Sequence, residues 1–551
     1  MKEMRSALPY GVAGECRRGL IRGMGYTQEE FQRPIVAVVN SWNEYNPGHL
    51  HLRTLAERVK QGIREAGGLP FEVMTSAVCD GMVLKNPRYI ELPSRNLIAD
   101  EVELIVESNM FDAMVLLSTC DSIVPGHLMA AARLDIPTIM VTGGYMPMPL
   151  FEGRSVNYIE LTDHVGKAMK GEYDRTQAER EVAGMYSPCG ACGVMTTANS
   201  MCFAAEALGM TLPGNGCMAA TGSELLQTAY RAGLRIMELL RENITARRIL
   251  TAGAIENAIA LTMATAGSTN LIMHLPAIAR EAGLTGKFWS SFDRASREIP
   301  QIVAASPSGP CHLQEVDRAG GTRAILRTLM PKLHGEALTV TGRTLAENYA
   351  DSPIYDPEVI RPLDRPVRQD GSLYVLYGSL APDGAIIKAG ACDIRTFTGR
   401  ARCFDSLDSA LAALNSEEIR PGDVAVLRYL GPRAAFGTTA YVFQKELKGR
   451  GLDRDVAIVT DGRFSGGSSG LSIGYLSPEA ALGGPLALVH DGDRIEIDLE
   501  ERKLELCVPQ SELEERKRTW SWQFDPSGVP PFLRLFCRNA GSLAEGAVWE
   551  C

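Results

Sequence analysis

The sequence predicts an α/β protein with an N-terminal doubly wound parallel-sheet domain and a second, β-rich C-terminal domain. Three observations lead to this prediction. Strand-like and helix-like runs alternate through the first third of the chain, and from about Pro353 the chain changes to short strand-like runs. The last of these runs has the alternating pattern of a hairpin. We therefore expect two domains, residues 1–355 and 356–551.

The N-terminal elements follow from this alternation. Strand-like runs are followed by helix-like runs and then by the next strand, which is the βαβ order of a parallel sheet. A Gly-rich turn then opens a helix at about Thr197, and more helices are expected through residues 222–283. The expected strands are 35–40, 71–78, 113–119 and 137–144, and the expected helices between them are 51–68, 94–109 and 126–134.

The C-terminal part is predicted to be rich in β-strands. Its strand-like runs are 372–378, 385–390, 424–431 and 456–462. In the final run, Ile495, Ile497 and Leu499 alternate with polar residues, and Leu504, Leu506 and Val508 repeat the pattern after a charged turn. Such paired alternation predicts a β-hairpin with one buried face.

Composition limits the classes of function. The 551 residues are 45% hydrophobic and 22% charged, which is typical of a globular chain. The net charge of -10 and the dispersed basic residues argue against nucleic-acid binding. No apolar run approaches the ~20 residues of a membrane span, and no signal peptide is evident. Thirteen scattered cysteines do not form a disulfide framework. We expect a cytoplasmic protein with a small-molecule substrate.

Reactive side chains gather where the predicted strands end. Cys120 and Asp121 follow a buried strand, and Asp80 follows another. Open α/β sheets collect ligand-binding groups at the carboxyl ends of their strands. Cys189 and Cys192 precede a predicted helix, whose N-terminus stabilises a thiolate. This C-x-x-C pair alone is equally compatible with a zinc or a redox motif.

Several motifs together resemble one enzyme family. "PGHLHLR", "LPSRNLIADEVE", "STCDSIVPGHLMAAARL", "CGACGVMTTANSM" and "TDGRFSGGSSG" occur in the order found in the dihydroxy-acid dehydratase and 6-phosphogluconate dehydratase family. The resemblance implies an iron-sulfur hydro-lyase that removes water from a 2,3-dihydroxy acid to give a 2-keto acid. It also implies a cluster in the α/β domain, a β-barrel-like C-terminal domain, a site between the two domains, and a homodimer or homotetramer.

The resemblance assigns roles residue by residue. Cys120 and Cys192 match the two cluster-binding cysteines of the family. Asp80 and Asp121 match carboxylates that hold Mg2+, and Ser465 matches the serine that accepts the substrate proton. A serine is a weak base, so it acts in this way only where cations or helix dipoles stabilise its alkoxide.

The cluster type depends on residue 48. Family members with a [2Fe-2S] cluster have a cysteine where this chain has Gly48 in "PGH". Members with "PGH" are associated with an oxygen-sensitive [4Fe-4S] cluster, so we expect [4Fe-4S], with [2Fe-2S] as the alternative. The third ligand stays open between Cys79 and Cys189.

The magnesium site departs from the family pattern. Ser122 occupies the position of a carbamylated lysine, and Ala440 that of a glutamate. Two of four expected protein ligands are therefore missing, which makes the chain an atypical member and leaves Mg2+ uncertain. The neighbouring loop introduces Lys85 and Arg88, and we hypothesise that one of these cations replaces Mg2+ in holding an acidic substrate.

Two classes of function remain. The first is a dehydratase, acting either on the branched-chain precursor 2,3-dihydroxy-3-methylbutanoate in amino-acid biosynthesis or on a sugar acid. The second is a family-derived protein that has lost dehydratase activity and serves as a binding or regulatory subunit. The retained Cys120, Cys192 and Ser465 favour the first.

Overall fold

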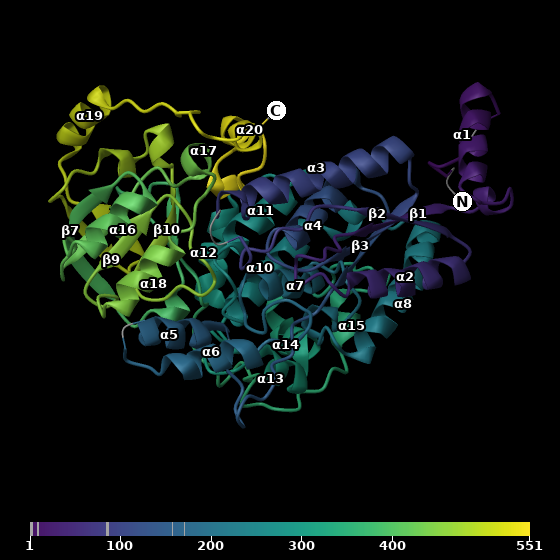
Figure 1. Ribbon diagram of the computed structural model, residues 1–551, viewed down its shortest axis with the longest axis horizontal. Helices are drawn as coiled ribbons and strands as arrows, with labels where there is room; N and C mark the ends of the chain where they lie inside the picture. The colour runs from purple at the N-terminus through teal and green to yellow at the C-terminus, as the bar shows by residue number, and fades with distance from the viewer. Residues whose placement is uncertain (1–3, 8–9, 84–86, 157, 170, 551) are drawn as a thin grey trace.

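The computed structural model describes residues 4–7, 10–83, 87–156, 158–169 and 171–550. An α/β part made from the N-terminal two thirds of the chain lies beside a β-rich part made mainly from the C-terminal third (Figure 1). Each part contains one sheet, and both sheets were expected from the sequence.

Four parallel strands form the sheet of the N-terminal part. Nearly all of their residues are buried except at the edge strand, as expected for parallel strands that are covered on both faces. The order across the sheet is β2 (Leu69–Met74), β1 (Ile35–Asn40), β3 (Ala113–Ser118) and β4 (Thr138–Thr142).

Helices cover both faces of this sheet, which confirms the predicted doubly wound arrangement. On one side α2 (Leu52–Glu65) packs against α8 (Ser223–Glu242), and on the other α3 (Leu92–Asn109) packs against α4 (Ile123–Leu134) (Figure 1). Glycines permit the close α2–α8 contact, since a Cβ on Gly62 would lie 2.3 Å from the carbonyl oxygen of Tyr230.

The remaining helices of this part surround the sheet. Every residue of α7 is buried, so its sequence lacks the polar face of a surface helix. No helix in the described ranges combines the length and the apolar character needed to cross a membrane. These helices are α1 (Val12–Gly23), α5 (Tyr158–Met169), α6 (Arg175–Gly184), α7 (Thr197–Ala207), α9 (Ala246–Ile249), α10 (Ala252–Ala264), α11 (Leu271–Glu281), α12 (Phe288–Glu298), α13 (Leu313–Arg318), α14 (Gly321–Leu329) and α15 (Leu345–Tyr349).

The C-terminal sheet curls into a barrel-like form. Its two edge strands approach each other at Tyr377, whose backbone N–H donates to Arg502 and whose carbonyl accepts from Leu504. The order is β12 (Lys503–Leu506), β11 (Arg494–Asp498), β7 (Thr396–Phe404), β8 (Asp423–Leu427), β9 (Ala457–Thr460), β10 (Ser472–Ser477), β6 (Gly384–Ile387) and β5 (Tyr374–Leu376).

The predicted hairpin is confirmed, with Ile495 opposite Leu506 and Ile497 opposite Leu504.

Two strands, β7 and β10, were not predicted from the sequence. Strand β7 contains arginines, and strand β10 follows a Gly-rich turn. Neither segment therefore reads as an apolar run in the sequence. The helices of this part are α16 (Leu407–Asn415), α17 (Pro432–Ala435), α18 (Tyr441–Gly449), α19 (Gln510–Thr519) and α20 (Pro531–Asn539).

The end of the chain returns to the N-terminal part. The fully buried Arg95 of α3 donates to the carbonyl oxygens of Gly546 at 2.5 Å and Ala547 at 3.3 Å. The neighbouring Asn96 side chain also donates to Ala547, at 3.1 Å. The last residues therefore tie the two parts of the molecule together.

Candidate active site

The site is built around the carboxyl ends of β1 and β3, where Cys120 and Asp121 follow β3. These neighbouring strands lead into α2 and α4, which pack on opposite faces of the sheet. Such a switch point leaves a crevice between the two connections, and it is where open α/β sheets bind their ligands.

Cys120 follows β3 with a left-handed backbone, φ 67°, and is buried. The ring nitrogens of the fully buried His49 lie 2.7 Å from the Ser41 carbonyl oxygen and 2.9 Å from that of Thr119. This imidazole therefore fixes the loop after β1 against the end of β3, so it positions Cys120 and does not ligate a metal.

Gly48 faces the Cys120 thiol. A Cβ on Gly48 would lie 2.5 Å from the sulfur of Cys120, so any side chain here would displace the thiol. The same sulfur lies 3.7 Å from Oδ1 of Asn46, to which the thiol can donate. The amide nitrogen Nδ2 of Asn46 is buried and has no partner within the described residues.

Three of the four candidate thiols are close enough to influence one another. Burial raises the pKa of Cys120 well above its usual value, and Cys79, Asp121 and Cys192 add to this effect. Burial and then the carboxylate of Asp80 raise the pKa of Cys79 to about 11. The structure therefore brings Cys79, Cys120 and Cys192 together at one place.

Cys192 lies in a recess. Burial, followed by Asp80, Cys79 and Asp121, raises its pKa, yet the residue is accessible to water and borders a cavity of ≈ 30 Å³. Cys189 differs, because burial alone raises its pKa. Backbone bonds pair this loop with the segment after β4, including Met146 N–H to Ala191 O at 2.6 Å.

Three carboxyl groups form a second cluster beside these thiols. One oxygen from each of Asp80, Asp121 and Glu91 lies within 4.8 Å of the others. In the described part of the chain, no other three His, Cys, Asp or Glu side chains bring their ligand atoms this close together. The cysteine sulfurs are therefore too widely spaced for three of them to share a single ion. Burial raises the pKa of Asp80 and of Asp121, and the repulsion of neighbouring carboxylates adds to it.

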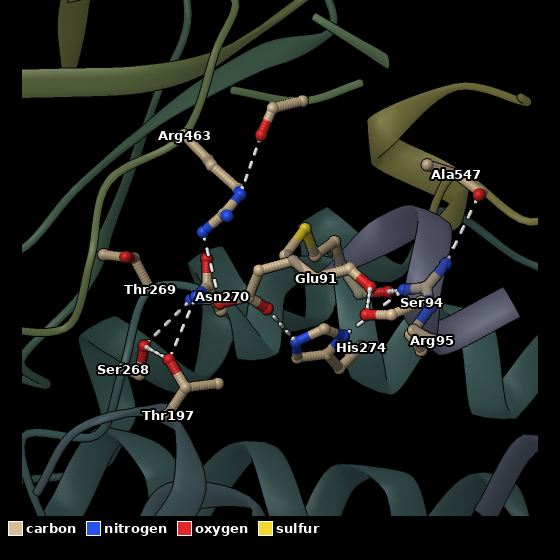
Figure 2. Close-up of polar contacts among 12 residues, drawn as sticks. Glu91, Ser94, Arg95, Thr197, Ser268, Thr269, Asn270, His274, Arg463 and Ala547 are labelled. Carbon is tan, nitrogen blue, oxygen red and sulfur yellow. Dashed lines mark hydrogen bonds and ion pairs between the residues drawn. The ribbon is translucent and has the colours of Figure 1, made fainter. Parts of the chain in front are cut away.

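Glu91 was not predicted as a site residue. It accepts hydrogen bonds from Asn270 Nδ2 at 2.9 Å and His274 Nε2 at 3.2 Å, and it forms an ion pair with Arg463 at 3.2 Å (Figure 2). Burial opposes its ionisation, but Arg463 and His274 outweigh burial and lower the pKa of Glu91. A single glutamate before "LPSR" gave no pattern by which to find it.

The cation at this cluster is Arg463. Arg463 is buried and lowers the pKa of both Asp80 and Asp121 in opposition to burial. Of the two cations hypothesised from the sequence, Arg88 is exposed and Lys85 lies outside the described residues.

Ser465 comes from the barrel-like part, on the loop between β9 and β10. This loop lies against the start of α7, since a Cβ on Gly466 would be 3.1 Å from Cα of Thr196. The backbone N–H of Gly467 donates to Ser465 Oγ at 3.4 Å, and the buried Lys388 donates to the Gly466 carbonyl at 2.8 Å. Arg463 of the same loop pairs with Glu91, so the loop of Ser465 lies beside the carboxylate cluster.

The two positions that depart from the family pattern are both buried. Ser122 begins α4, directly after Asp121. Ala440 begins α18, and its backbone N–H donates to the carbonyl of Arg463 at 2.9 Å. Ala440 is therefore connected to the carboxylate cluster through Arg463.

A family model described as "Dihydroxy-acid/6-phosphogluconate dehydratase N-terminal" matches residues 33–348, and its C-terminal counterpart matches residues 358–547. The chain belongs to this family. It is an iron-sulfur hydro-lyase that dehydrates a dihydroxy acid to a keto acid.

Curated relatives of this hydro-lyase match over almost its whole length. A dihydroxy-acid dehydratase of Moorella thermoacetica is 45% identical, with 99% of this chain and 100% of the relative covered. Dihydroxy-acid dehydratase 1 of Methanosarcina acetivorans and a dihydroxy-acid dehydratase of Pyrococcus abyssi are each 44% identical at the same coverage.

Proposed function

We propose that Cys79, Cys120 and Cys192 hold the iron-sulfur cluster of this dehydratase. The observation that carries the proposal is the gathering of these three thiols at the switch point of the sheet, beside the carboxylates. Cys189 is left out, because its pKa responds to burial alone.

A [4Fe-4S] cluster fits this site better than [2Fe-2S]. Three cysteines leave one iron of a four-iron cluster without a protein ligand, which is what binding of a substrate oxygen requires. Gly48 supplies no ligand, and its lack of a side chain leaves the Cys120 sulfur free of steric overlap. The buried Nδ2 of Asn46, which has no partner among the described residues, would offer a hydrogen-bond donor to the cluster.

A divalent cation such as Mg2+ fits the carboxylate cluster. Hard cations prefer carboxylate oxygens, and Asp80 and Asp121 lie close enough to share one ion. Both carboxyl groups have a raised pKa in the protein alone, because burial and charge repulsion disfavour their charged forms. A bound cation would stabilise these charged forms. Ser122 and Ala440 make the site atypical, because neither contributes the anionic ligand of the family pattern.

The protein's own residues perform the proton transfer. When bound, the cluster supplies a Lewis acid for the 3-hydroxyl and the cation offsets the charge that develops on the enolate. Ser465 Oγ, as the alkoxide that the Gly467 N–H stabilises, accepts the proton from carbon 2 and becomes a neutral hydroxyl. The C3–O bond then breaks, the leaving hydroxide takes the proton from Ser465 to give water, which restores the alkoxide, and the enol becomes the 2-keto acid.

The proposed catalytic groups are divided between the two parts of the chain. We assign the cluster and carboxylates to a domain of residues 1–355 and Ser465 to a domain of residues 356–551. The separate family matches to residues 33–348 and 358–547 support this boundary. The substrate is a small hydroxy acid, and the assembly is a homodimer or homotetramer.

A keto-acid assay on anaerobically reconstituted protein tests this function. A panel of branched-chain dihydroxy acids and sugar acids is offered to the wild type and to Cys120→Ala as the control. Keto acid from at least one acid with the wild type, and none with Cys120→Ala, is expected. No product from any acid, despite full iron content, would instead favour a binding or regulatory subunit.

A further inference from the structure

We infer that Glu91 is a third carboxylate ligand of the divalent cation and takes over from the anionic ligands that Ser122 and Ala440 cannot provide. The inference rests on the proposed function, since it concerns the same cation. It adds a residue that neither the resemblance nor the sequence pattern assigned to the site.

The backbone turns Glu91 towards the other carboxylates. Glu91 stands at the start of α3 with φ 65° and ψ -106°, and its side chain makes no capping hydrogen bond to the helix. A helix-start glutamate normally remains at the surface, whereas this residue is only 1% exposed. Its oxygen instead lies within 4.8 Å of those of Asp80 and Asp121.

The partners of Glu91 orient its carboxylate and leave acceptor capacity unused. Oε1 accepts from Asn270 and Arg463, and Oε2 accepts from His274 (Figure 2). Each carboxylate oxygen accepts about two hydrogen bonds, so Oε2 retains a lone pair. Ligating carboxylates in proteins are held by hydrogen bonds of this kind.

A divalent cation would stabilise the charged form of the carboxyl groups at this site. Buried ions are stable only when they are paired. Arg463 and Arg95 favour the charged form of Glu91. The pKa values of Asp80 and Asp121, in contrast, stay raised, so these two carboxyl groups are the ones that a divalent ion would pair with. Ions that prefer oxygen ligands are therefore the expected occupants.

Glu91 and Ala440 are linked through one residue. The backbone carbonyl of Arg463 accepts from the Ala440 N–H, and the guanidinium of the same arginine pairs with Glu91. The family pattern has a glutamate at position 440, next to the backbone of Arg463, and this chain lacks it. The carboxylate of Glu91, at the guanidinium end of the same arginine, takes its place.

Titration with Mn2+, followed by electron paramagnetic resonance of the free ion, tests the inference on anaerobically purified protein. We expect one tight site per chain in the wild type and a Kd weakened roughly 10–100-fold in Glu91→Gln. Glu107→Gln, which removes an exposed carboxylate from the same helix, is the matched control and is expected to bind as the wild type does. Iron content and the thermal midpoint check that each variant folds.

A second variant covers the case in which Glu91→Gln does not fold. Glu91→Asp keeps the charge but withdraws the carboxylate by one methylene, and an intermediate affinity is expected. Unchanged affinity in Glu91→Gln, or in Glu91→Asp if Glu91→Gln is unfolded, overturns the inference. If Asp121→Asn abolishes binding at the same time, the proposed cation site still stands. No Mn2+ binding by a folded, iron-loaded wild type overturns both the inference and the cation site.

Discussion

In our proposal, binding of the iron-sulfur cluster depends on three thiols from three separate loops. Cys79 follows β2, Cys120 follows β3, and Cys192 lies before α7, yet Cys79 and Cys192 raise the pKa of Cys120, and Cys79 also raises the pKa of Cys192. Cys189 lies three residues from Cys192 but does not take part in this coupling. The C-x-x-C motif is therefore not a ligand pair in our account.

The paired variants Cys79→Ala and Cys189→Ala test this distinction. Cys79→Ala is expected to lose nearly all bound iron, because two remaining cysteine ligands would hold the cluster too weakly. Cys189→Ala is expected to retain the iron content and absorbance of the wild type. Iron and sulfide analysis after anaerobic reconstitution measures both, and the reverse result would make Cys189 the ligand.

Ser465→Ala separates proton transfer from cluster binding. Loss of a positioned general base typically costs about 10²–10⁴-fold in rate, so kcat is expected to fall by this amount. Iron content is expected to stay unchanged, since Ser465 lies on the barrel-like part. Steady-state keto-acid formation provides the measurement, and a kcat within a few-fold of the wild type would exclude the serine as the base.

Sequence reasoning at this scale found the residues that belong to motifs. It named Cys79, Cys120 and Cys192, which the structure brings together. It did not find Glu91, because the backbone turn that buries this carboxylate depends on contacts with α11 and the barrel-like part. Contacts between such distant segments leave no local pattern.

At the scale of elements, Lys388 fixes the loop that carries Ser465. Lys388 follows β6, is buried, and donates to the Gly466 carbonyl. Burial lowers the pKa of Lys388 to about 7. The folded protein therefore binds this proton more weakly than the unfolded chain does.

This difference gives a pH dependence of stability with a defined sign. Between pH 7 and the ordinary lysine pKa of 10.5, the unfolded chain holds the proton and the folded protein does not, so stability rises with pH. The slope from this group is at most about 1.4 kcal/mol per pH unit. Lys388→Met is expected to lose this slope.

Thermal midpoints of the wild type and Lys388→Met at pH 6, 8 and 10 would measure the effect. The difference between the two proteins should change steadily in favour of the wild type above pH 7. A difference independent of pH would show that Lys388 keeps its proton in the folded protein.

Elements were predicted best where apolar runs are continuous. All four strands of the parallel sheet follow from such runs, and the terminal hairpin follows from its alternation of apolar and polar residues. The strands β7 and β10 were missed because arginines and glycines interrupt their apolar positions. Tertiary pairing with neighbouring strands, rather than local pattern, makes them strands.

At the scale of the whole molecule, the end of the chain joins the two parts. Arg95 is fully buried and donates to carbonyl groups near the C-terminus. A nearby exposed ion pair, Arg280 with Glu545 at 2.7 Å, connects α11 to the same segment. This return could not be predicted from the sequence, because it joins positions about 450 residues apart.

Arg95→Met and Arg280→Met compare a buried contact with an exposed one. Arg95→Met leaves buried carbonyls without donors and is expected to destabilise the protein by about 3 kcal/mol or more. Arg280→Met is expected to cost less than about 1 kcal/mol, since exposed ion pairs contribute little. Denaturant unfolding measures both, and equal effects would contradict a joining role for Arg95.

The most direct test of the account is the Mössbauer spectrum of 57Fe-reconstituted protein, recorded before and after a dihydroxy acid that the protein dehydrates is added. We predict a [4Fe-4S] spectrum in which the signal of one iron, the one without a cysteine ligand, changes when the acid binds. A [2Fe-2S] spectrum, or a [4Fe-4S] spectrum that the substrate leaves unchanged, would contradict the central claim that three cysteines hold a cluster with one open iron.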